Sequence, residues 1–108
     1  MFNYEGNDLN SLFKVKKGVR SMRQSSYATD GTNEDCIRIK PGETLRVFRE
    51  ERPGIMRHIW ITMDGQDPDF LRKTVLRMYW DGEDTPSVET PIGDFFNLPN
   101  SSLRSFIS

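Results

Sequence analysis

Acidic side chains are the groups in this chain that could carry out bond-breaking chemistry. Two carboxylates flanking a bond are the usual equipment for glycoside hydrolysis. Eight candidates lie in turns or strand-like runs: Asp35, Glu50, Glu51, Asp81, Glu83, Asp84, Glu89 and Asp94. No spacing distinguishes a pair among them, so the pattern identifies no catalytic residue. Each one is expected to be a solvated turn or strand residue.

The most ligand-like polar cluster lies on one stretch of chain that contains Tyr27, Asn33 and Asp35. Sugar recognition uses planar amides and carboxylates for hydroxyl pairs and an aromatic face for the apolar side of the ring. The three residues supply these types and are our candidate substrate-binding residues. The alternative is purely conformational, because Asn and Asp also form turns.

His58 and Cys36 are the single histidine and the single cysteine. A lone histidine is expected to be hydrogen-bonded within the structure, and a ligand contact beside Trp60 is the alternative. A lone cysteine forms no internal disulfide and is expected to be a buried, inert thiol. With neither zinc-ligand spacing nor a phosphate-binding glycine loop, we expect no metal and no cofactor.

Composition and charge narrow the classes of partner. Fifteen basic and sixteen acidic residues leave a net charge of −1, which predicts neither nucleic-acid nor membrane binding. No apolar stretch approaches the roughly 20 residues of a membrane span, and the first residues do not resemble a signal peptide. We therefore expect a cytoplasmic protein.

Local patterns predict a short helix followed by four strands. Leu9, Leu12 and Phe13 share one helical face, whereas the later apolar residues alternate with a period of two. Turns are predicted at Pro41-Gly42 and Asp81-Gly82. The expected elements are a helix at about 8–17, a loop at 24–35, strands at about 36–40, 43–49, 55–63 and 70–81, and an irregular proline-rich segment at 86–100.

Antiparallel strands joined by short turns predict a mainly β fold, a partial jelly roll or β-sandwich with a short N-terminal helix. A jelly roll needs about eight strands, so residues 1–108 are expected to form a single incomplete jelly-roll domain with exposed strand edges. Trp60 and Trp80 lie in apolar runs and are expected to fill a core, although one of them could line a sugar-binding surface.

Several motifs, in the same order, resemble the N-terminal part of glycoside hydrolase family 172, formerly the domain of unknown function 2961 family. The matching stretches are Arg20–Tyr27, Asp30–Asp35, Ile37–Thr44, Pro53–Trp60, Leu76–Glu83 and Pro86–Phe96. The last of these reads Pro-Ser-Val-Glu-Thr-Pro-Ile-Gly-Asp-Phe-Phe. The chain departs from the family pattern at Ala28, where an aspartate is usual, and at Thr32, where a glycine is usual.

The resemblance implies two jelly rolls assembled into trimers or larger oligomers. It also implies retaining hydrolysis of fructofuranosides or arabinofuranosides by two glutamates downstream of the matched region. It gives a substrate-lining contribution to Tyr27, Asn33 and Asp35. It implies a structural role for four further residues: Trp60, Trp80, Asp94 and Phe95.

Two functional hypotheses follow from the resemblance. The first is an N-terminal fragment of a furanoside-active glycoside-hydrolase-like protein of carbohydrate metabolism, truncated or split, and not catalytic by itself. The alternative is a non-catalytic jelly-roll module that binds carbohydrate or assembles oligomers. The expected partners are a furanoside and either further copies of the chain or a missing C-terminal portion.

Overall fold

The computed structural model describes residues 17–98. The chain divides into two compact units, Met1–Ile55 and Met56–Ser108, which we describe separately. Within the described residues, all helices and strands lie in the second unit, in the order α1 (Phe70–Lys73), β1 (Val75–Met78), β2 (Val88–Pro91) and α2 (Ile92–Phe95). The helix expected at 8–17 lies outside the described residues, apart from Lys17.

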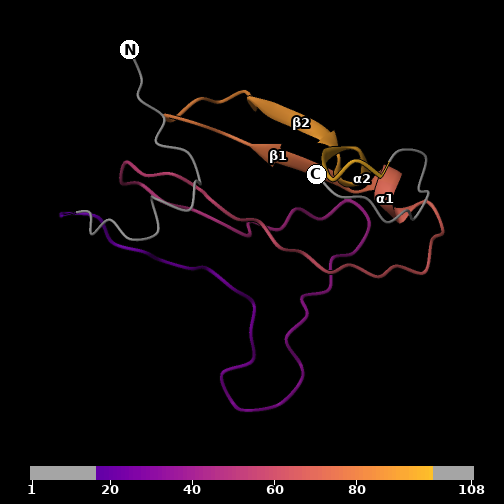
Figure 1. Cartoon of the computed structure of the whole chain (residues 1–108). Coiled ribbons are helices and arrows are strands. Elements are labelled where there is room, and N and C mark those ends of the chain that lie inside the picture. The colour runs from indigo at the N-terminus through magenta and orange to yellow at the C-terminus, as the bar shows by residue number, and fades with distance from the viewer. Residues whose placement is uncertain (1–16, 99–108) are drawn as a thin grey trace. The chain divides into compact units, whose positions relative to one another are not determined.

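The second unit is built on an antiparallel hairpin. β1 pairs with β2 so that Val75 lies opposite Pro91 and Met78 opposite Val88, and Figure 1 shows the two arrows side by side. Beyond β1 the chain reverses where the Glu83 amide donates to the Trp80 carbonyl at 2.9 Å. Asp81 and Gly82 have φ values of 51° and 71°. The turn predicted at Asp81-Gly82 is therefore confirmed, and positive φ at both central positions is typical of a type I′ turn, which Asp-Gly favours.

A compact corner forms where α1 enters the hairpin and α2 leaves it (Figure 1). Leu71 of α1 and Ile92 of α2 are the buried hydrophobic residues of the described chain. The Ile92 amide donates to the Thr74 carbonyl at 2.8 Å. This bond joins the start of α2 to the residue between α1 and β1. Arg72 and Asp94 form an ion pair across the same corner. The corner thus combines a small apolar core with a polar link at its surface.

The strand predicted over 70–81 is corrected at both ends, because Phe70–Lys73 form a helical turn and β1 ends at Met78. The Asp67 carboxylate accepts from the Asp69 amide at 2.8 Å and from Lys73 Nζ at 2.5 Å. The Asp67 carbonyl also accepts from the Phe70 amide at 3.1 Å. These bonds wind the chain into a turn before the period-two pattern begins at Val75.

The segment predicted to be irregular, 86–100, also contains regular structure. Val88–Pro91 form β2 and Ile92–Phe95 form α2. Pro91 ends the strand, where its missing N–H removes no central ladder bond. Pro86 precedes β2 and Pro91 is its last residue, so the segment predicted to be irregular contains a short strand.

The three strands predicted at 36–40, 43–49 and 55–63 are not assigned as strands in the structure. A strand is defined by the backbone bonds to its neighbour, and within residues 17–98 the ladder that forms is the β1–β2 pair. The turn between the first two segments is confirmed: the Glu43 amide donates to the Lys40 carbonyl at 3.0 Å, and Gly42 has a φ of 81°. This φ is that of the third residue of a type II turn.

The described part of the chain thus has a two-stranded antiparallel sheet and little helix. This composition is compatible with a mainly β fold, and the jelly roll stays a prediction because two strands do not identify one. Among residues 17–98, no helix has the length and apolar character needed to cross a membrane.

Candidate functional site

The candidate site is the loop from Ser26 to Asp35 in the first unit. The Ser26 hydroxyl donates to the Asp35 carbonyl at 2.9 Å and closes the base of the loop. Just before it, the Gln24 side-chain oxygen accepts from the Arg49 amide at 3.2 Å. Figure 1 shows the chain running out and back through this loop. Two hydrogen bonds between residues distant in sequence therefore hold the ends of a segment that has no helix or strand of its own.

The tip of the loop is shaped by Asp30, Gly31 and Thr32. One Asp30 carboxylate oxygen accepts from the Thr32 hydroxyl at 2.7 Å and from the Thr32 amide at 3.0 Å. Gly31 has a φ of 81°, a conformation that glycine adopts without strain. The Thr32 hydroxyl and then its backbone N–H lower the pKa of Asp30. Asp30 is therefore an ionised turn residue whose acceptor oxygen is already occupied.

The three predicted substrate-binding residues share this loop, and all three are exposed. Tyr27 follows Ser26 directly at the base, Asp35 supplies the carbonyl that Ser26 binds, and Asn33 lies between them beyond the tip. The Tyr27 side chain is 59% exposed. The structure thus places an aromatic ring, an amide and a carboxylate on one short loop, on an open surface.

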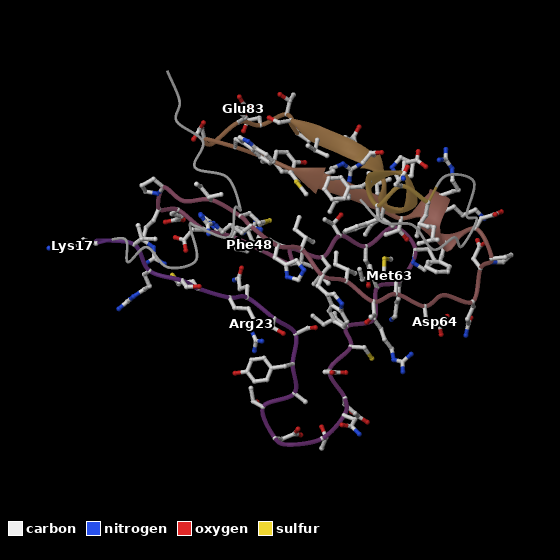
Figure 2. The ribbon with its side chains drawn as sticks, viewed as in Figure 1. Lys17, Arg23, Phe48, Met63, Asp64 and Glu83 are labelled. Atoms are coloured by element: carbon white, nitrogen blue, oxygen red, sulfur yellow. The ribbon has the colours of Figure 1, made fainter. Side chains whose placement is uncertain are left out.

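Arg23 is a residue that the sequence analysis missed. Its guanidinium carbon lies 5.8 Å from the centre of the Tyr27 ring, within the distance of a cation–π contact. Figure 2 labels Arg23 in the segment that leads into the loop. The available signal was an arginine four residues before the one aromatic residue of the loop.

Hydrogen bonds and ion pairs lower the pKa of several carboxyl groups among the described residues. Arg52 lowers the pKa of Glu50 to about 2, chiefly by hydrogen bonding from its side chain. Lys73 lowers the pKa of Asp67 in the same way. A glycosidase acid needs a raised pKa so that it holds a proton at neutral pH. Asp30, Glu50 and Asp67 are shifted in the opposite direction and are poor candidates for that role.

A shallow, open depression is lined by Arg49, Glu50, Glu51 and Arg52. These residues are consecutive, and they neutralise one another: Arg49 pairs with Glu51 at 2.5 Å and Arg52 with Glu50 at 2.8 Å. A hollow formed by one short stretch of paired charges offers no convergent donors for a ligand. Among the described residues, no group of three His, Cys, Asp or Glu side chains could hold a metal ion.

The four residues expected to be structural have different surroundings. Trp60 and Trp80 are 74% and 49% exposed, so neither fills a core in this chain. Asp94 pairs with Arg72 at the corner of the second unit. The Phe95 ring meets the Phe96 ring edge to face, with 5.0 Å between their centres. Asp94 and Phe95 thus make contacts within α2 and its neighbours, whereas the tryptophans lie open.

Comparison with known proteins gives one match. A family model described as GH172 domain-like covers residues 29–105. This range includes the tip of the candidate loop and the whole hairpin with its two helical turns. No curated protein and no solved structure matches the chain at a significant level.

Proposed function

The chain belongs to the GH172 domain-like family, and from this premise we propose that it is part of a furanoside-active glycoside-hydrolase-like protein. In this proposal the chain supplies scaffold and a sugar-contacting loop, and it does not hydrolyse glycosides by itself. The family relationship concerns glycoside hydrolases as a class. The furanoside, the fragment status and the lack of independent catalysis are the proposed parts.

The observation that carries the proposal is the exposure of the apolar residues of the first three predicted strands. Within 36–63, the following large hydrophobic side chains are exposed: Ile37, Ile39, Val47, Phe48, Ile55, Met56, Trp60, Ile61 and Met63. Large apolar side chains exposed in such number along one stretch of chain favour contact with other polypeptide. We infer that other polypeptide covers these segments in the working protein.

The carboxylates support the same proposal. Glu50, Glu51 and Glu89 each pair with an arginine. Retaining hydrolysis needs two carboxyl groups roughly 5 Å apart, one of which holds a proton. Arg52 lowers the pKa of Glu50 to about 2, so Glu50 is a poor proton donor, and in the proposal the catalytic pair belongs to other polypeptide.

Hydrolysis of aryl furanosides tests this proposal. The purified chain is incubated with 4-nitrophenyl α-L-arabinofuranoside and, separately, with a fructofuranoside at several pH values between 4 and 8. We expect release of product at the rate of buffer alone. Saturable hydrolysis that a Glu→Gln substitution abolishes would overturn the proposal that the chain is not catalytic by itself.

The same exposed residues also favour a second candidate, a non-catalytic module that binds carbohydrate or assembles oligomers. In this case a second copy of the chain would cover the apolar segments. Light scattering separates the candidates: a defined trimer or hexamer supports the module, whereas concentration-dependent aggregation supports a part of a larger protein.

A further inference from the structure

The contact between Arg23 and Tyr27 bears on how the loop could meet a sugar. The Arg23 guanidinium lies over the Tyr27 ring at 5.8 Å from its centre, and the tyrosine is still 59% exposed. An aromatic ring has two faces, and the cation lies over one of them. With the residue 59% exposed, we take the face away from Arg23 as the one that a ligand could reach.

The backbone beside the ring is also fixed. Ser26 precedes Tyr27, and its hydroxyl donates to the Asp35 carbonyl at 2.9 Å. This bond restrains the backbone of Tyr27, and Arg23 restrains its ring. A ring that is already ordered loses less side-chain entropy when a ligand stacks on it.

We propose that Arg23 is a positioning residue that holds the Tyr27 ring with one face covered and presents the other face to the apolar side of a furanoside. The inference rests on the proposed function, because it assumes that the Ser26–Asp35 loop contacts sugar. Arg23 acts through the ring and makes no contact with the sugar in this proposal.

The contact itself can be tested without a ligand. The ring current of Tyr27 should shift the NMR signals of the Arg23 side-chain protons upfield in the full chain. Tyr27→Leu should remove this shift, whereas Arg20→Ala, which deletes a neighbouring positive charge, should leave it unchanged. Arg23 signals at ordinary positions would show that the contact is absent in solution and would overturn the inference.

The consequence for binding is tested by titrating methyl α-L-arabinofuranoside and methyl β-D-fructofuranoside, with saturation-transfer NMR as the readout. An exposed cation–π contact is worth enough to change affinity by about two- to fivefold. We expect Arg23→Ala to weaken binding by that factor, Arg23→Lys to retain most of it, and Arg20→Ala to have no effect.

A double-mutant cycle distinguishes positioning from direct contact. If Arg23 acts through the ring, Arg23→Ala should have no further effect in a Tyr27→Leu background. An equal effect in both backgrounds would show that Arg23 touches the sugar itself and would overturn the inference. Binding by the wild-type chain that Arg23→Ala leaves unchanged would also overturn it, with the proposed function intact. Absence of binding by the wild-type chain would overturn both the inference and the proposed sugar contact.

Discussion

At the residue scale, the ion pairs of residues 17–98 lie at the surface. Glu50 is a clear case, because one of its carboxylate oxygens accepts from both the side chain and the amide of Arg52 at 2.8 and 3.0 Å. Hydrogen bonds of this kind favour the ionised carboxylate. They organise the short segment from Glu50 to Arg52 without burying it.

The titration of Glu50 gives the first prediction at this scale. Arg52 lowers its pKa from the usual 4.5 to about 2. A depressed pKa means that the contribution of the pair is present above pH 4.5 and is lost as the pH falls toward 2. We expect the Glu50 side-chain carbon signal to titrate near pH 2 in an NMR series. Arg52→Gln should return the midpoint toward 4.5.

The matched control is Arg49→Gln. Arg49 lies in the same segment but pairs with Glu51, so its loss should leave the Glu50 midpoint near 2. A Glu50 midpoint near 4.5 in the unmodified chain would show that the Glu50–Arg52 contact does not persist in solution.

At the element scale, the helical turns α1 and α2 owe their close approach to Gly93. A Cβ placed at Gly93 would lie 3.0 Å from Leu71 Cβ, 3.0 Å from the Leu98 carbonyl oxygen and 3.2 Å from the Leu71 carbonyl oxygen. Two of these three neighbours are backbone atoms, which move only if the backbone of α1 or of the segment after α2 moves. The corner is therefore packed too closely at position 93 to accept a side chain.

The second prediction is that Gly93→Ala destabilises this corner by about 1–3 kcal/mol, the usual cost of overpacking. The amides of Ile92 and Leu98 report on it directly, since they donate to the carbonyls of Thr74 and Gly93. Their hydrogen exchange should accelerate accordingly. Gly54→Ala is the control, because nothing lies within 4 Å of a Cβ at Gly54. Equal exchange in the Gly93 variant and the wild type would contradict the packing argument.

At this scale the sequence predicts the turns correctly. It does not predict the elements whose structure depends on the segment they pair with. Pro41-Gly42 and Asp81-Gly82 were predictable because φ preferences are local. The helical turn at Phe70 was missed because the apolar run after it has a strand pattern, and the signal lay in Asp67-Pro68-Asp69 before it. The β2 strand was not predicted because proline is unfavourable in regular strands. Its four residues nevertheless pair with β1.

At the scale of the whole molecule, the family was recognisable from ordered motifs, and the family model confirms it over residues 29–105. Residue types predicted a loop that carries Tyr27, Asn33 and Asp35, and the structure places all three on one exposed loop; their contact with a sugar stays a prediction. The role of Arg23 was not predictable, because its contact with Tyr27 depends on how the backbone bends. Burial was predicted least well: Trp60 was expected in a core and is 74% exposed, and Cys36 was expected to be buried and is exposed.

Our central claim is that the segments of 36–63 with alternating apolar residues do not form a β-ladder within this chain and pair with other polypeptide. The β1–β2 hairpin, by contrast, is paired within the chain. Native-state hydrogen exchange of the purified, non-aggregated chain tests this claim most directly. We predict slow exchange for amides of the β1–β2 ladder and the corner after it, and exchange close to the unprotected rate throughout 36–63. Protection across 36–63 comparable to that of the hairpin would show a self-sufficient β-sandwich and would contradict the account.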